Sequence, residues 1–229
     1  MEYGYLIGAL TSAFFWSVIF FTRKDLRKQM AITGLLFLPF FLLDKMLIPN
    51  YWQPRVIFDL YNKVGFSLES ILFMFTTSGL FAVLYEFVTR KTEKQTFKVD
   101  VSKITLFFVV YIYLTFLVLT NFGLEVHLLS SLIPFVVIII FIASQRQDLL
   151  KPIIVSSILG LGLYFISLLV FSYFFPNFFT NTYNLENLWG IFIIGIPLEE
   201  VLWGLYYPAL MACAYEYLFG VKLIKRESI

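Results

Sequence analysis

Four acidic residues lie within apolar stretches of the sequence or at the ends of such stretches. They are Glu199, Glu200, Glu69 and Asp44. A carboxylate in a membrane-length apolar stretch is costly and usually has a function. Carboxylates that share a dry pocket titrate together, so one can deliver a proton near neutral pH while an ionised one takes a proton back. The residue types therefore indicate acid–base chemistry.

Aromatic residues follow the two glutamate motifs. Glu199, Trp203 and Tyr206 fall on one face of a helix, and Tyr207 is adjacent; Phe73 follows Glu69 at the same spacing as Trp203 follows Glu199. Aromatic faces stabilise cations, so Phe73, Trp203, Tyr206 and Tyr207 are the predicted substrate-binding residues. Packing against lipid is the alternative interpretation for any one of them.

A repeat underlies this pattern. Residues 65–87 and 195–217 align without gaps and share eight identities, among them a Leu-Glu and a Tyr-Glu pair. A second match, at a similar offset, joins the basic segments 23–28 and 146–151. The same costly carboxylate thus recurs at one place in each half.

Structural interpretations of these acids compete with the chemical one. Acids in the first turn of a helix complement its dipole, and Pro197 suits the first helical position, so Glu199 and Glu200 could mark a water-facing helix start. Asp44 could form an ion pair with Lys45.

The composition predicts an all-α polytopic membrane protein. The 229 residues are 60% hydrophobic and 14% charged, with 28 Phe and a mean hydropathy of +0.84. The net charge of only +2 does not indicate a nucleic-acid-binding protein. The single cysteine cannot form a disulfide within the chain. No cofactor or metal site is expected, and the first apolar stretch is interpreted as a retained span. The oligomeric state is not readable, although a homo-oligomer is compatible with the sequence.

Apolar windows of about 20 residues predict seven transmembrane helices. They lie near residues 3–21, 31–49, 65–88, 104–121, 127–143, 153–175 and 189–219.

Basic residues predict the orientation. With seven spans, all but three of the 17 Lys and Arg residues fall on one side; the exceptions are Lys45, Arg55 and Lys63. The N-terminus is therefore expected outside and the C-terminus in the cytoplasm, in the inner cell membrane. Each half becomes a three-helix unit, so the expected domains are repeat 1 over 1–95, a linking helix over 96–122 and repeat 2 over 123–229. The two repeats run parallel, and their meeting place is the expected site.

The residues from Pro197 to Glu200, followed by Tyr207-Pro208 and Tyr215-Glu216, resemble the integral-membrane lycopene cyclase family. Asp44, Tyr51-Trp52 and Leu68-Glu69 resemble the first copy of the same domain. The resemblance covers nearly the whole chain. Two departures, Ser67 in place of Pro and Ser70 in place of Glu, make the first copy chemically weaker.

The resemblance implies a fold of two tandem membrane domains and a redox-neutral cyclisation of lycopene ends to ionone rings. A proton adds to the terminal double bond, the cation closes a ring, and a neighbouring proton leaves. By resemblance, Glu199 and Glu200 match the family's paired acids, and Glu69 matches the first acid of the other pair. The implied partners are a lipid-soluble polyene and membrane lipid.

Two alternatives stay open. A small-solute transporter of parallel-repeat type shares the topology but does not explain the Leu-Glu pairs. A non-catalytic carotenoid-binding protein is compatible with Ser70. A CAAX-type membrane protease is disfavoured, because Gly204 stands where an Arg is needed and His127 is the only histidine.

Overall fold

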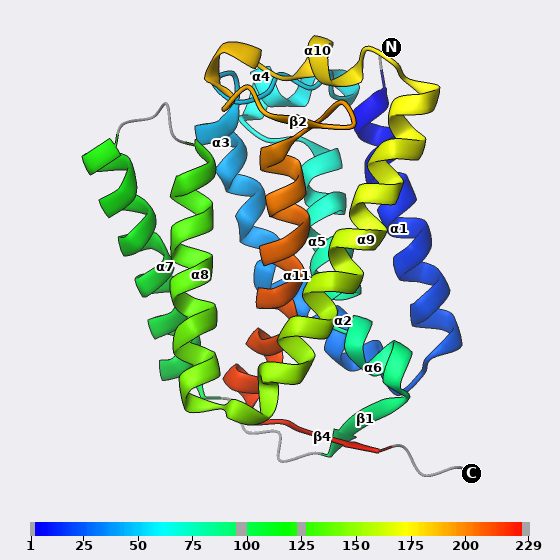
Figure 1. The fold of residues 1–229 in the computed structure, drawn as a ribbon, viewed down its shortest axis with the longest axis vertical. Helices are drawn as coiled ribbons and strands as arrows, with labels where there is room; N and C mark the ends of the chain where they lie inside the picture. The colour runs from blue at the N-terminus through cyan, green and yellow to red at the C-terminus, as the bar shows by residue number, and fades with distance from the viewer. Residues whose placement is uncertain (1–2, 95–99, 123–126, 226–229) are drawn as a thin grey trace.

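The computed structural model describes residues 3–94, 100–122 and 127–225 and is mostly helical. The long helices run along the longest axis of the molecule (Figure 1). The end that carries the N-terminus is called the upper end here, and the end that carries the C-terminus is called the lower end. The expected helical class is confirmed.

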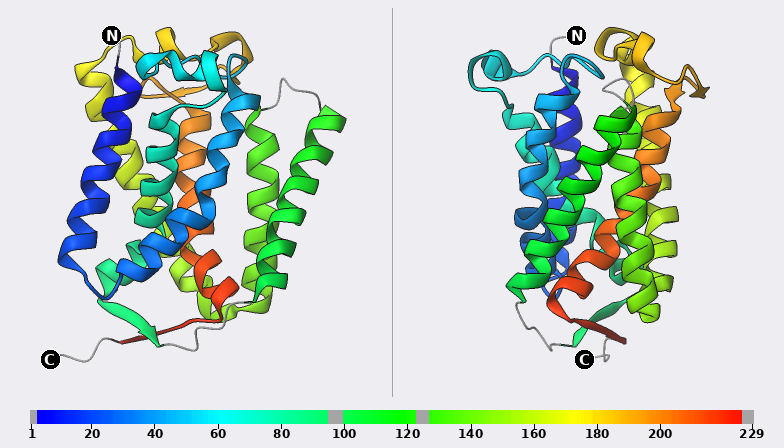
Figure 2. Two further views of the ribbon diagram at one scale, coloured as in Figure 1. Left: turned by 180° about the vertical axis from the view of Figure 1, so that it is seen from behind. Right: turned by 90° about the vertical axis from the view of Figure 1, so that its left-hand side faces the viewer.

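The long helical elements alternate in direction between the two ends (Figures 1 and 2). They are α1 (Gly4–Thr22), α2 (Arg27–Phe37) continued by η1 (Leu38–Leu43) and α3 (Asp44–Leu47), α5 (Leu68–Phe81) followed by α6 (Leu84–Thr89), α7 (Val101–Phe122), α8 (His127–Gln145), α9 (Leu150–Phe174) and α11 (Leu198–Phe219). A short turn, η3 (Gln147–Leu149), precedes α9.

Several of these helices are suited to a membrane. Among the described residues, four helical stretches are long and apolar enough to cross one: Gly4–Thr22, Leu68–Thr89, Val101–Val118 and Gln147–Phe174. Helix α11 is not among them, and most of its side chains are buried inside the protein. It is therefore a central helix, surrounded by other helices.

The last predicted span, near 189–219, is long enough to tilt or to begin with a short interfacial segment, and its helix α11 begins only at Leu198. Residues before Leu198 form a small hairpin of β2 (Phe192–Ile193) and β3 (Ile196–Pro197). Gly190, Ile194 and Gly195 have φ angles of 72°, 52° and 80°, which a right-handed helix does not accept. A window of apolar residues registers hydrophobicity but not these backbone turns.

The predicted span at 65–88 also begins later. Gly65 has a φ of 81°, and α5 starts after Ser67, whose Oγ accepts a hydrogen bond from the Ser70 N–H at 3.0 Å. This is an N-cap, which satisfies one of the free N–H groups at a helix start. Ser67 thus has a structural use at the position where the second half has Pro197.

Helices α5 and α11 form the centre of the molecule. Helix α5 packs on α1 and α2, whereas α11 packs on α9, α8 and also α5. Helices α7 and α8 pack together on one flank (Figure 2). Because α5 and α11 carry the two Leu-Glu motifs, the central contact brings the two halves of the chain together.

Two connecting segments cover the upper end. The first upper segment, residues 48–67, holds η2 (Ile57–Asp59) and α4 (Leu60–Val64). The second upper segment, residues 175–197, holds α10 (Phe178–Thr182), η4 (Leu185–Asn187) and the hairpin. They join through a β-bridge between Trp52 and Tyr183 and through a hydrogen bond of 3.0 Å from the Asn184 N–H to the Tyr51 carbonyl.

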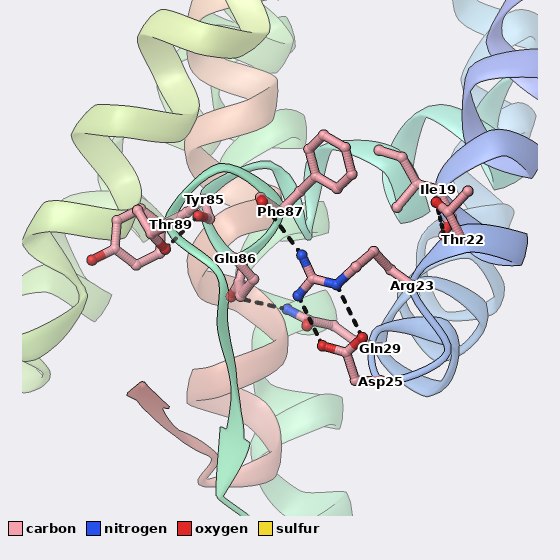
Figure 3. A network of polar contacts seen from close by, with 9 residues as sticks. All are labelled: Ile19, Thr22, Arg23, Asp25, Gln29, Tyr85, Glu86, Phe87 and Thr89. Atoms are coloured by element: carbon pink, nitrogen blue, oxygen red, sulfur yellow. Dashed lines mark hydrogen bonds and ion pairs between the residues drawn. The ribbon is translucent and has the colours of Figure 1, made fainter. Parts of the chain in front are cut away.

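An arginine fixes the first turn at the lower end. The Arg23 guanidinium donates two hydrogen bonds to the Asp25 carboxylate, at 3.0 and 2.8 Å. It also donates to the Phe87 carbonyl at 3.3 Å, which ties this turn to the end of α6 (Figure 3). A bidentate pair of this kind holds both groups in one orientation.

The second half repeats this arrangement. Arg146 donates to both oxygens of Asp148 at 2.7 Å and to the carbonyls of Glu216 and Val221 at 3.3 and 2.9 Å. Strand β1 (Lys91–Lys94), after α6, pairs antiparallel with β4 (Lys222–Lys225), after α11. The lower ends of the two central helices are therefore held in the same way and joined to each other.

Gln29 links the two halves near this end. Its amide Nε2 donates to Glu216 Oε1 at 2.7 Å and to Glu86 Oε1 at 3.4 Å (Figure 3 shows the Glu86 bond). All three side chains are completely buried. The two Tyr-Glu pairs of the repeat thus meet around one amide.

Candidate active site

A cavity of about 570 Å³ lies between the two central helices and the helices around them. Its wall is mainly aromatic and aliphatic. Three of the four predicted carboxylates, Asp44, Glu199 and Glu200, line it, and each is less than 10% exposed. The fourth, Glu69, is buried but is not among the lining residues.

Glu200 is surrounded by tyrosine hydroxyls. Tyr51 donates to Oε1 at 3.1 Å, and Tyr164 donates to Oε2 at 2.5 Å. The Tyr183 hydroxyl also hydrogen-bonds to this carboxylate. These donors come from the first upper segment, from α9 and from the second upper segment, so Glu200 is the polar junction of three parts of the chain. A carboxylate that accepts several hydroxyl donors is well suited to hold a negative charge.

The tyrosines of the upper segments remain protonated donors at this junction. Burial, and then the charge of Glu200, raises the pKa of Tyr51 well above its usual range. The same two causes raise the pKa of Tyr183. Neither hydroxyl ionises near neutral pH.

Glu69 and Glu199 make matching contacts. Glu69 Oε1 accepts a hydrogen bond from the Ile57 N–H at 2.7 Å, and Glu199 Oε1 accepts one from the Trp189 N–H at 2.6 Å. Each carboxylate thus holds the upper segment that precedes its own helix. The other oxygen, Oε2, is buried in both residues and has no hydrogen-bond partner among the described residues. Only Glu199 presents its side chain to the cavity.

Asp44 belongs to a different cluster, next to Ser70. The Ser70 hydroxyl donates to Asp44 Oδ2 and accepts a hydrogen bond of 2.9 Å from the Tyr5 hydroxyl. A Ser67 hydroxyl lies 2.8 Å from Ser70 Oγ. The position where the resemblance expects a second glutamate therefore contacts an aspartate from another helix.

The four predicted substrate-binding aromatics all line the cavity. The Trp203 ring stacks on Tyr207 at 4.7 Å and on Phe73 at 5.7 Å between centroids. Tyr206 packs against Phe135 at 5.4 Å. The stack of Phe73, Trp203 and Tyr207 crosses from α5 to α11, which gives the cavity a continuous aromatic wall between the halves.

The cavity reaches the surface beside α1 and α9. Its lining includes Ile7 and Phe15 from α1 and Ile166, Val170 and Phe174 from α9, all of which are exposed. These helices come close at the upper end, where a Cβ at Gly4 of α1 would lie 3.3 Å from Phe171 of α9, and they diverge toward the lower end (Figure 1). The exposed part of the lining is therefore mostly apolar, which suits a lipid-soluble ligand.

Sequence reasoning missed four polar groups of the site: Tyr5, Tyr164 and Tyr183 were not considered, and Tyr51 was noted only as part of the resemblance. A signal was available, because a buried carboxylate needs donors and Tyr164 is a hydroxyl in an apolar span. Among the described residues, no cluster of three or more His, Cys, Asp or Glu could hold a metal ion.

The fold and the cavity define a class: a helical protein suited to a membrane, with buried carboxylates on the wall of an aromatic pocket. Residues 126–218 match the family model described as "Lycopene cyclase". The match covers less than half of the chain and lies in its second half, which contains Glu199 and Glu200, so this half is similar to lycopene cyclases. No curated protein and no solved structure matched the chain.

Proposed function

We propose that this protein is a carotenoid cyclase that converts linear end groups of a polyene such as lycopene to ionone rings. The observation that carries the proposal is the Glu200 carboxylate, which faces an aromatic cavity and accepts hydrogen bonds from tyrosine hydroxyls. The family match supports the same activity. The small-solute transporter receives no such support.

The reaction needs a proton donor, a proton acceptor and a wall that tolerates positive charge. A carboxylic acid on the cavity wall protonates the terminal double bond, and the resulting cation closes a six-membered ring. A base then removes a neighbouring proton, so the product is an isomer of the substrate. General acid–base catalysis of this kind contributes about 10²- to 10⁴-fold.

Glu200 is the acceptor in this scheme, because its hydroxyl donors stabilise the ionised form. Asp44 and Glu199 are the other carboxylates at the cavity. The stacked Phe73, Trp203 and Tyr207 rings present aromatic faces that lower the energy of the cation. Glu69 does not line the cavity, and in this scheme its carboxylate positions the first upper segment by accepting the Ile57 N–H.

The proposal includes the seven-span, two-repeat architecture. The alternating directions of the long helices support it (Figure 1), as do the matching Arg–Asp pairs at the lower end. The matching contacts of Glu69 and Glu199 support it at the upper end. In this view the cavity lies between the two repeats, in the inner cell membrane.

The direct test is Glu200→Gln, which keeps the side-chain shape and removes the titrating group. The wild-type chain is expected to produce cyclised carotenoid in a lycopene-accumulating bacterium, as measured by chromatography of the pigments. Glu200→Gln is expected to lower ring formation by about 100-fold or more. The matched control is Glu186→Gln, which alters an exposed carboxylate in η4 and should leave conversion unchanged.

Two results would contradict the proposal. No ring formation by a folded wild-type protein would remove the activity. Wild-type conversion by both Glu200→Gln and Glu199→Gln would remove the assignment of these carboxylates.

A further inference from the structure

We infer that Asp44 is the proton donor of the cyclisation and that Tyr5 and Ser70 resupply its proton from the upper surface. This inference rests on the proposed function and adds to it a path by which protons reach Asp44. The route consists of two hydroxyls between a second cavity and the carboxylate.

The two hydrogen bonds between Tyr5, Ser70 and Asp44 run in the same direction, from donor to acceptor toward Asp44. Tyr5 donates to Ser70 Oγ at 2.9 Å, and Ser70 donates to Asp44 Oδ2. A carboxylate at the end of a row of hydroxyl donors is the natural receiver of a proton, since each hydroxyl can pass its own proton on and take another from behind. Within the described part of the chain, no hydrogen bond joins Glu200 to Ser70, and the donors to Glu200 are Tyr51, Tyr164 and Tyr183.

A second cavity lies next to Tyr5, the first hydroxyl of this hydrogen-bonded row. It has a volume of about 340 Å³ and is lined by Gln53, Pro54, Arg55, Phe178, Asn181 and Thr182, together with Gly4 and Tyr5. Gln53, Arg55 and Asn181 are exposed, so this cavity opens at the upper end. Gly4, Tyr5 and Phe178 line both cavities. Of these three shared residues, Tyr5 is the one with a polar side chain, so its hydroxyl is the group of this set that could pass a proton between the two cavities.

The reaction makes such a route necessary. When Asp44 gives its proton to the polyene, the carboxylate must be reprotonated before the next ring. Ser70 passes its hydroxyl proton to Asp44, Tyr5 passes its own to Ser70, and Tyr5 receives a proton from water in the second cavity. The proton that Glu200 removes from the cation returns to solvent, so uptake and release balance and no co-reactant is consumed.

The test measures formation of the first ring separately from formation of later rings, which require Asp44 to be reprotonated. Purified protein in lipid is mixed with lycopene and the rings are counted over time in H₂O and in D₂O. For Tyr5→Phe we expect an initial burst close to the protein concentration at the wild-type rate, followed by turnover slowed by about tenfold or more. The slow phase should also show a larger solvent isotope effect than the wild-type protein.

Conservative variants separate proton transfer from packing. Ser70→Ala should behave like Tyr5→Phe, whereas Ser70→Thr keeps a hydroxyl and should restore turnover. The matched control is Thr76→Val, which removes another hydroxyl pair between α1 and α5, the bond of 2.8 Å to Ser12. This variant should keep wild-type turnover and isotope effect.

The outcomes distinguish the inference from the function on which it rests. Wild-type steady turnover in both Tyr5→Phe and Ser70→Ala would overturn the route while leaving the cyclase intact. Loss of the burst itself would overturn it as well, because a group that only resupplies protons is not needed for the first ring. If the wild-type protein forms no ring at all, the proposed function fails first.

Discussion

Identical side chains have different tasks at this site because their hydrogen-bond partners differ. Glu199 and Glu200 are neighbours in the sequence, yet one accepts a backbone N–H and the other accepts tyrosine hydroxyls. Successive residues on a helix point in directions about 100° apart, so Glu199 meets a backbone N–H of the second upper segment, whereas Glu200 meets hydroxyls from α9 and from both upper segments. Under the proposed function, the pair motif therefore combines a contact that holds the second upper segment with the proton acceptor.

This difference predicts how Glu69 and Glu199 respond to substitution. Glu69→Gln keeps an acceptor for the Ile57 N–H, so cyclisation should stay within a few-fold of wild type. Glu69→Ala leaves that part-buried N–H without its acceptor, which costs about 1 kcal/mol, and the first upper segment should become more sensitive to protease. Glu199→Gln also keeps its loop contact but should lower cyclisation by about tenfold or more, since it alters a carboxyl group on the cavity wall.

Pigment yield in the lycopene-producing host and limited proteolysis in detergent measure the two effects separately. Equal losses of activity in Glu69→Gln and Glu199→Gln would show that both carboxyl groups act in the same way.

At the scale of the elements, the close approach of α9 to α11 shapes the cavity. A Cβ atom at Gly160 would lie 2.3 Å from Cγ of Pro208, so only glycine fits there. At the next turn, a Cβ at Gly204 would lie 2.8 Å from Tyr164, the tyrosine that donates to Glu200. Small residues at helix crossings allow backbones to approach, as is common in membranes.

A pair of glycines on α9 tests this contact. Gly160→Ala should destabilise the protein by about 1–3 kcal/mol through overpacking, and it should lower cyclisation because α9 carries Tyr164. Gly162→Ala changes the same residue type in the same helix, but the new Cβ would meet nothing within 4 Å. That control should be neutral or slightly stabilising, because alanine is the better helix former. Thermal unfolding in detergent provides the measurement, and equal melting temperatures for the two variants would contradict the packing argument.

The sequence predicts the elements well where hydrophobicity alone decides them. Apolar runs of membrane length predict the positions of α1, α7, α8 and α9 within a few residues. The starts of α5 and α11 depend on glycines with positive φ and on a capping serine, which a hydropathy window does not register.

The site was predictable in its residue types but not in its partners. Asp44, Glu199, Glu200 and the aromatic wall follow from motif and spacing. The contact of Asp44 with Ser70 and the hydroxyls around Glu200 arise from packing between segments more than 25 residues apart, and a single sequence does not encode such distances in a readable pattern.

At the scale of the whole molecule, most basic residues in the described part of the chain lie toward the lower end. Lys45, Arg55 and Lys63 belong to α3 and the first upper segment, whereas Arg23 and Lys24 lie in the turn before α2, Arg146 precedes η3 and Lys151 is in the first turn of α9. Basic residues are retained on the cytoplasmic side of membrane proteins. The lower end is therefore expected to face the cytoplasm and the second cavity to face outward.

Cysteine labelling tests this orientation in intact cells. Glu186→Cys places a thiol on the exposed η4 at the upper end, and Lys24→Cys places one on an exposed turn at the lower end. The native Cys213 is completely buried and gives little background. A membrane-impermeant thiol reagent should label Glu186→Cys in intact cells and Lys24→Cys only after the membrane is opened. The reverse pattern would invert the topology and would place the mouth of the Tyr5 route in the cytoplasm, whereas labelling of both in intact cells would mean that the long helices do not carry the chain across the membrane as proposed.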